Sequence, residues 1–196
     1  MDADIEHQLR AFVDDAFSKL PYIANRQEPQ YVTSLMALLR GTVFKGHDRL
    51  LRFQTTAIDD RGFASAENKW GADFAVTALI ANGGTQILKA AIGQAKKGAI
   101  EVLNATEQAF LKDQIAKMRK ATRDILVAQV PTHDGGLFSI REVQRSADAK
   151  YILKKAESLA DYLVRMCDCE HGDQNLDFVY AVQDSSLATL KIIYEH

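Results

Sequence analysis

The chain has 196 residues, of which 47% are hydrophobic and 26% are charged, and its formal net charge is −2. This length suffices for one domain with a buried core, and no apolar run approaches the roughly 20 residues of a membrane-spanning helix. The nearly neutral balance argues against a protein that coats nucleic acid through bulk charge, although a local basic face can still bind it.

The first part of the chain is predicted to be mainly helical. Apolar residues at helical spacing predict an amphipathic helix over residues 2–20, which Pro21 ends. A second helix is predicted over about 30–40. Residues 49–58 alternate enough to form a strand, and the polar stretch 59–70 is rich in turn-forming residues.

A β-hairpin is the strongest local prediction. Residues 71–80 are mostly apolar and indicate a buried strand that Asp73 opens. The turn signal Asn82-Gly83-Gly84 follows, and residues 85–96 form the returning strand. The start of the first strand should therefore lie beside the end of the second.

The rest of the chain continues the alternation of helices and strands. A helix is predicted over about 103–122, with Phe110 on its apolar face, and a short strand over residues 125–130. A helix over about 147–167 and strands near 177–182 and 188–194 follow. The predicted fold is one α/β domain with a central mixed β-sheet flanked by helices. Its parts are N-terminal helices over 1–45, a catalytic core over about 46–140, and a C-terminal helix and strands over 141–196.

A possible metal site follows from the hairpin. Side chains two residues apart on a strand share a face, so Gln94 and Lys96 point the same way and Ala95 points away. Asp73 should lie across from them. A hard divalent ion such as Mg²⁺ or Mn²⁺ could take the Asp73 carboxylate, the Gln94 amide oxygen and the Ala95 carbonyl as ligands, and Lys96 could stabilise negative charge on a phosphate.

One carboxylate is little charge for such a site, so a second acid is expected. Glu28, at the start of the second helix, and Glu67, in the loop before the hairpin, are the two candidates.

The same residues resemble the PD-(D/E)xK nuclease superfamily, in its restriction-endonuclease-like branch. The resemblance rests on residues 67–76, which contain Gly71-Ala72-Asp73, and on residues 92–97, where Gln94-Ala95-Lys96 replaces the usual (D/E)xK. Weaker likeness extends over roughly residues 28–175. It implies that Asp73 is the metal-binding aspartate, that Lys96 is the lysine of the motif, and that Glu28 resembles the helix-borne acid of such nucleases.

The resemblance implies a Mg²⁺- or Mn²⁺-dependent endonuclease in restriction or antiphage defence, with DNA as the first expected substrate and RNA left open as the alternative. A homodimer or a partner protein of a defence system is expected, with no membrane association. Gln94 removes a negative charge from the motif. The alternative is therefore a catalytically inactive nucleic-acid-binding or regulatory subunit that keeps the fold; a structural subunit of a larger complex is a third option.

Simpler interpretations compete with each of these assignments. Asp73 could cap a turn, and Gln94 and Lys96 could be solvated residues of an edge strand, where lysine protects against pairing. A set of polar residues that follows the hairpin could contact phosphates. These residues could equally form a solvated helix surface, because positive side chains near the C-terminus of a helix interact favourably with its dipole. This set consists of Lys97, Lys112, Gln114, Lys117, Arg119, Lys120 and Arg123.

The remaining distinctive residues are the cysteines and the tryptophan. Cys167 and Cys169 are the only cysteines and are one residue apart, which excludes a disulfide framework; a buried thiol pair is expected in preference to a soft-metal site. Their scarcity, and an acidic N-terminus without a secretory signal, predict a cytoplasmic location. Trp70 is expected to pack in the core, with contact to a base as the alternative.

Overall fold

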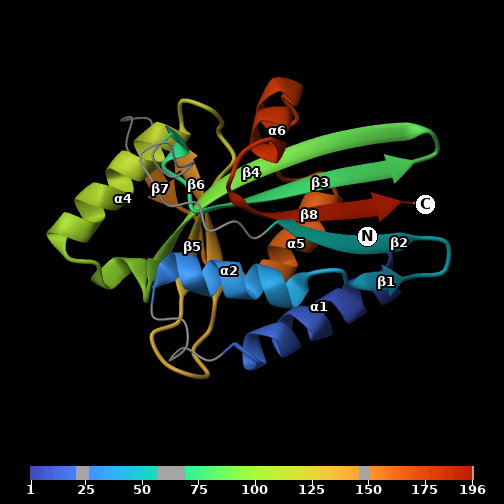
Figure 1. Cartoon of the computed structure of the whole chain (residues 1–196), viewed down its shortest axis with the longest axis horizontal. Helices are drawn as coiled ribbons and strands as arrows, with labels where there is room; N and C mark the ends of the chain where they lie inside the picture. The colour runs from blue at the N-terminus through green and yellow to red at the C-terminus, as the bar shows by residue number, and fades with distance from the viewer. Residues whose placement is uncertain (21–26, 57–68, 146–150, 196) are drawn as a thin grey trace.

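Eight strands form one mixed sheet at the centre of the protein (Figure 1). The computed structural model describes residues 1–20, 27–56, 69–145 and 151–195. The strand order is β1-β2-β8-β3-β4-β5-β6-β7. The strands are β1 (Val43–Lys45), β2 (Leu50–Thr56), β3 (Phe74–Asn82), β4 (Thr85–Lys97), β5 (Ile125–Val130), β6 (Ser139–Arg145), β7 (Tyr151–Leu153) and β8 (Ala188–Glu195).

Helices cover both faces of this sheet, which confirms the predicted α/β class. The apolar side chains of α1, α2 and α5 share one core with one face of the strands, and those of α4 and α6 share a second core with the other face. The described residues contain α1 (Ala3–Ser18), α2 (Glu28–Leu39), α4 (Ala105–Met118), α5 (Leu159–Cys167), α6 (Leu176–Gln183) and the short 3₁₀ helix η2 (Ile100–Val102).

The predicted hairpin is present as β3 and β4. Asn82 pairs with Thr85, so the loop consists of Gly83 and Gly84. Both glycines have positive φ, 55° and 86°, as a two-residue hairpin turn of the favoured kind requires. β8 lies parallel to β3 on one side, and β5 lies parallel to β4 on the other. The hairpin is therefore interior to the sheet.

Two predicted elements differ from those in the structure. The helix expected over 147–167 is present only as α5, which begins at Leu159, because β7 occupies residues 151–153; residues 147–150 lie outside the described part of the chain. The strand expected near 177–182 is instead α6. Asn175 caps α6 by accepting hydrogen bonds from the backbone N–H groups of Asp177 and Phe178, and this local polar signal outweighs the strand propensity of the valines.

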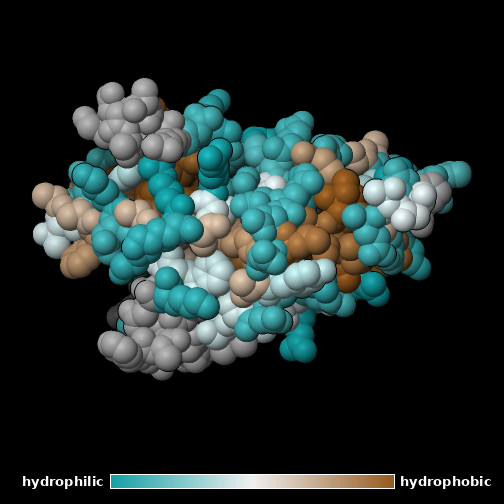
Figure 2. All heavy atoms as spheres, turned by 90° about the horizontal axis from the view of Figure 1, so that it is seen from above, coloured by the Kyte–Doolittle hydropathy of each residue, from teal (hydrophilic) through white to brown (hydrophobic). Residues whose placement is uncertain are grey.

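The face of the sheet beside α4 and α6 is mixed in polarity. Figure 2, which looks onto the molecule from above, shows an apolar area over the strands next to α6 and hydrophilic surface around it. Leu88 of β4 is half-buried and packs against the core on this side. Within the described ranges, no helix has the length and apolar composition that crossing a membrane would need.

A glycine allows the two central strands to pack closely at the end that carries Asp73. Gly93 pairs with Phe74, whose ring lies directly over it: a Cβ added to Gly93 would be 2.3 Å from the ring atom Cζ of Phe74. Phe74 is only 2% exposed, so its ring has little room to move.

Gly93→Ala should therefore destabilise the protein by about 1–3 kcal/mol through overpacking, measured by urea unfolding. Phe74→Leu removes the ring and supplies the matched control. The double variant should be more stable than the sum of the two single effects predicts. Additive effects would show that the ring and the added methyl group do not collide.

Candidate metal centre

β4 extends beyond the start of β3, and this offset leaves part of its edge without a strand partner. β3 begins at Phe74, opposite Gly93, whereas β4 continues to Lys97. Two carboxylates take the place of the missing strand. Asp73 Oδ2 accepts the backbone N–H of Ala95 at 2.9 Å, and Glu28 Oε1 accepts the backbone N–H of Lys97 at 3.1 Å.

The spacing of these two donors places the acids side by side. Ala95 and Lys97 are two residues apart, so their N–H groups point the same way and lie about 6.7 Å apart along the strand. The Ala95 carbonyl oxygen lies on the same edge between them. Glu28 comes from the first turn of α2 and Asp73 from the residue before β3. Segments far apart in sequence thus bring two carboxylates to the edge that carries the Ala95 carbonyl.

The Gln94 side chain completes this group of oxygens. It is 3% exposed. Its Nε2 donates hydrogen bonds to Asp73 Oδ2 and, at 3.3 Å, to the Ala95 carbonyl. Its Oε1 is buried and has no hydrogen-bond partner among the described residues. The expected proximity of Asp73 and Gln94 is therefore confirmed.

Either orientation of the Gln94 amide leaves a polar atom poorly placed. As it stands, a buried oxygen lacks a partner in the described part of the chain, which costs about 1–3 kcal/mol. A half-turn of the amide would direct Oε1 at the Asp73 and Ala95 oxygens, where oxygen would face oxygen. A cation at this point would be attracted to all three oxygens, so the donor set fits a hard divalent ion.

Lys96 lies next to this edge and faces a pocket. The alternation of β4 places Gln94 and Lys96 on the α4 face, while Ala95 is fully buried in the opposite core, as predicted. The pocket has a volume of about 330 Å³, and both Lys96 and Glu28 line it. Within the described part of the chain, the ammonium group of Lys96 makes no hydrogen bond or ion pair.

The opposite wall of the pocket is α4, held close by a glycine. Gly71 has φ of 73°, and a Cβ there would lie 2.8 Å from the Gln114 carbonyl oxygen and 3.0 Å from Lys117 Cβ. The segment that leads into Asp73 therefore lies against α4. Gln114 and Lys117 line the pocket, and Lys117 forms an ion pair with Asp113 at 3.0 Å.

The other residues proposed to contact phosphate do not form one basic face. Arg119, Lys120 and Arg123 line a separate hollow at the C-terminal end of α4, and Arg119 donates to the Gln144 carbonyl at 2.8 Å. Lys112 is exposed and lines neither hollow. Lys97 contributes its backbone N–H to Glu28. Glu67, the other candidate for the second acid, lies outside the described residues, and Glu28 is in place.

The prediction that Phe110 lies on the apolar, core-facing side of its helix is wrong. Its side chain is 64% exposed and lines the pocket, whereas the buried stripe of α4 consists of Leu111, Ile115 and Met118. Phe110 directly precedes the first residue of that stripe, so it points away from the core. Trp70 packs as expected: it is 7% exposed and its ring lies 5.8 Å from that of Phe178.

No family model matches the chain, and no curated protein or solved structure matches it. Among the residues that the structure describes, no three His, Cys, Asp or Glu side chains gather as a metal-binding group. The candidate centre differs from such a group because it combines two acids with an amide and a backbone carbonyl.

The cysteines are not the expected buried pair. Cys167 is buried at the end of α5, and this burial raises the pKa of its thiol to about 12. Cys169 is exposed and has a positive φ of 65°, because the chain turns sharply after the helix.

Only Cys169 should therefore react with iodoacetamide in the folded protein at pH 8, since the thiolate is the reactive form and Cys167 is both protonated and buried. Mass spectrometry of tryptic peptides would measure the two sites separately. Both cysteines should react after unfolding in guanidinium, and equal labelling rates in the folded protein would contradict this assignment.

Proposed function

We propose that this protein is a Mg²⁺- or Mn²⁺-dependent nuclease that hydrolyses phosphodiester bonds at the bare edge of β4. The observation that carries the proposal is the convergence of the Asp73 and Glu28 carboxylates on successive N–H groups of that edge, with the Gln94 amide between Asp73 and the Ala95 carbonyl. Oxygen ligands of this kind are those that a hard divalent ion takes.

Each residue of the centre would have a distinct role. Asp73, Glu28, Gln94 and the Ala95 carbonyl would hold the ion, which when bound polarises a phosphoryl oxygen and activates water. Lys96 would place its ammonium group beside the phosphate and stabilise the negative charge that develops there. Gln94 is uncharged where the motif usually has an acid. The carboxylates of Asp73 and Glu28 still give the site negative charge.

The wider identity of the enzyme belongs to the same proposal. Along the chain, α2 carries the acid Glu28, β3 and β4 form the hairpin, and α4 leads to β5, which lies parallel to β4. This order supports a restriction-endonuclease-like architecture. We infer DNA as the substrate, a role in restriction or antiphage defence, and a homodimer or a defence partner, on the resemblance of the Gly71-Ala72-Asp73 and Gln94-Ala95-Lys96 segments.

A binding module without turnover is the second candidate, and one observation favours it. The Gln94 amide donates a hydrogen bond to Asp73, so the Asp73 carboxylate has a partner without an ion. An ionised carboxylate at position 94 could not donate such a hydrogen bond. In this case the protein would bind nucleic acid through the same pocket and would cleave nothing.

Plasmid DNA and RNA cleavage with Mg²⁺, with Mn²⁺ and with EDTA tests the proposal. Asp73→Ala and Lys96→Ala should each lower the rate by about 100-fold or more, because one removes a ligand and the other a charge at the developing oxyanion. Lys112→Ala is the matched control, since Lys112 is an exposed lysine away from the pocket, and it should cleave like the wild type.

Metal binding gives a readout that does not depend on turnover. Mn²⁺ should raise the melting temperature of the wild type, increasingly with the logarithm of the free Mn²⁺ concentration above the dissociation constant, and should not raise that of Asp73→Ala. Cleavage by Asp73→Ala at the wild-type rate would refute this site. Stabilisation by Mn²⁺ without cleavage of either nucleic acid would favour the binding module.

A further inference from the structure

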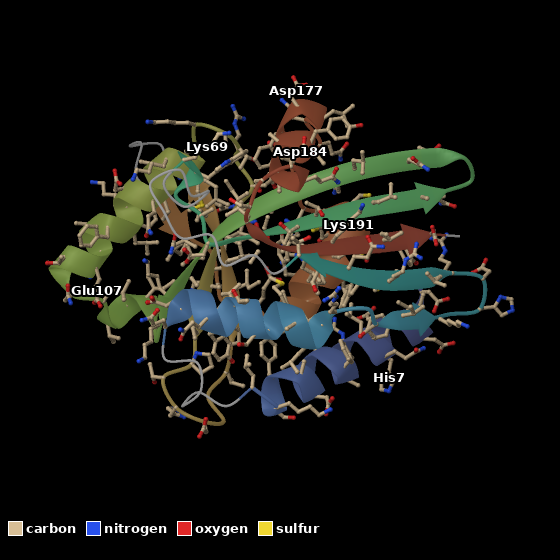
Figure 3. All side chains as sticks on the ribbon, in the orientation of Figure 1. His7, Lys69, Glu107, Asp177, Asp184 and Lys191 are labelled. Atoms are coloured by element: carbon tan, nitrogen blue, oxygen red, sulfur yellow. The ribbon has the colours of Figure 1, made fainter. Side chains whose placement is uncertain are left out.

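The pocket beside the candidate centre has walls of different chemistry. β4 contributes Lys96, and α4 contributes most of the opposite wall. α4 extends past the strands in Figure 1, and residues 105–110 of its first half are all exposed. Figure 3 labels Glu107 on this projecting part of α4. The residues that line the pocket are Glu28, Lys96, Leu103, Glu107, Phe110, Asp113, Gln114 and Lys117.

Three groups in this pocket lack, among the described residues, the partners that their chemistry calls for. The Lys96 ammonium has no ion-pair partner in the described ranges. The Gln114 Oε1 atom is buried and accepts no hydrogen bond from a described residue. The Phe110 ring is 64% exposed although it is large and apolar. A cation and an aromatic face thus line one cavity, and Gln114, whose Oε1 atom is buried, forms part of its wall.

We propose that this pocket binds one unstacked nucleotide of a single-stranded nucleic acid. The phosphate lies toward Lys96, and the face of the base stacks on Phe110. The inference rests on the proposed function for its choice of a phosphodiester ligand, and it adds the substrate class: single strands, or a strand whose base has been flipped out.

A paired duplex does not offer these contacts. Its base faces are covered by their neighbours and its hydrogen-bonding edges are paired, so a ring such as Phe110 can stack only on a base that has left the helix. A volume of about 330 Å³ is at the small end of the range for ligand sites, which suits one nucleotide and not a helix.

The charge of the pocket supports recognition of one nucleotide and not of a long phosphate track. Lys117 is paired with Asp113, and Glu107 is held by the N-terminal cap of α4, where it accepts the backbone N–H of Asn104 at 2.9 Å. Lys96 is therefore the main cation directed at the ligand from the pocket walls. Stacking, which tolerates any base, should contribute more than phosphate charge, and the salt dependence of binding should be shallow.

Fluorescence anisotropy with a labelled 12-nucleotide single strand and with its duplex tests the inference, in Ca²⁺ and in EDTA. The single strand should bind more tightly than the duplex. Phe110→Ala should weaken single-strand binding by about 5- to 140-fold, and Phe110→Trp should restore it.

Phe110 is exposed, so its replacement by a good helix former should leave the melting temperature unchanged. Leu137→Ala, at a side chain 90% exposed, is the matched control.

An abasic nucleotide locates the contact. Removing the base that stacks on Phe110 should weaken wild-type binding as much as Phe110→Ala does, and should weaken binding to Phe110→Ala no further. Scanning the abasic position along the strand identifies that base. Equal effects on both proteins at every position would overturn the inference, as would a duplex that binds as tightly as the single strand.

The outcomes separate the inference from the proposed function. Single-strand binding that depends on Phe110 but is not followed by cleavage under any metal keeps the inference and refutes the nuclease. Cleavage that depends on Asp73 but is indifferent to Phe110 keeps the nuclease and refutes the inference. Absence of nucleic-acid binding by the wild type in both Ca²⁺ and EDTA overturns it as well, and would leave the pocket to a ligand of another class.

Discussion

The offset between β3 and β4 is the constraint on which the candidate site depends. Where β3 has not yet begun, the backbone donors of β4 still require partners, because a buried N–H without one is costly. Asp73 and Glu28 supply those partners at Ala95 and Lys97. The need to complete the sheet therefore draws two carboxylates to the same edge, and the candidate site results from the way in which backbone hydrogen bonds are satisfied.

Glycines set how closely the elements around this edge approach one another. Gly93 leaves room for the Phe74 ring beside Asp73, and Gly71 lets the preceding segment touch the backbone of α4. Packing therefore fixes both ends of the short stretch that carries Asp73. A site held from two sides keeps its oxygens in place before a ligand arrives, which is what binding and catalysis require of their first contacts.

The position of α4 divides its residues between the core and the pocket. Its second half covers the sheet through Leu111, Ile115 and Met118, whereas its first half extends beyond the strands and is exposed. Phe110 lies at the junction of the two halves. Its exposure follows from this geometry, because the first half of the helix extends past the strands (Figure 1).

The sequence by itself determined the hairpin, the face shared by Gln94 and Lys96, and the proximity of Asp73, because alternation along strands and a two-glycine turn are local properties. It also determined the mixed α/β class. Only the tertiary structure decided that Glu28 reaches Lys97, that β8 inserts between β2 and β3, that Phe110 faces a pocket, and that Cys169 is exposed. These features depend on which distant segments meet and on where a helix extends past the sheet. The periodicity of apolar residues along the sequence is a local signal, so it predicts neither of them.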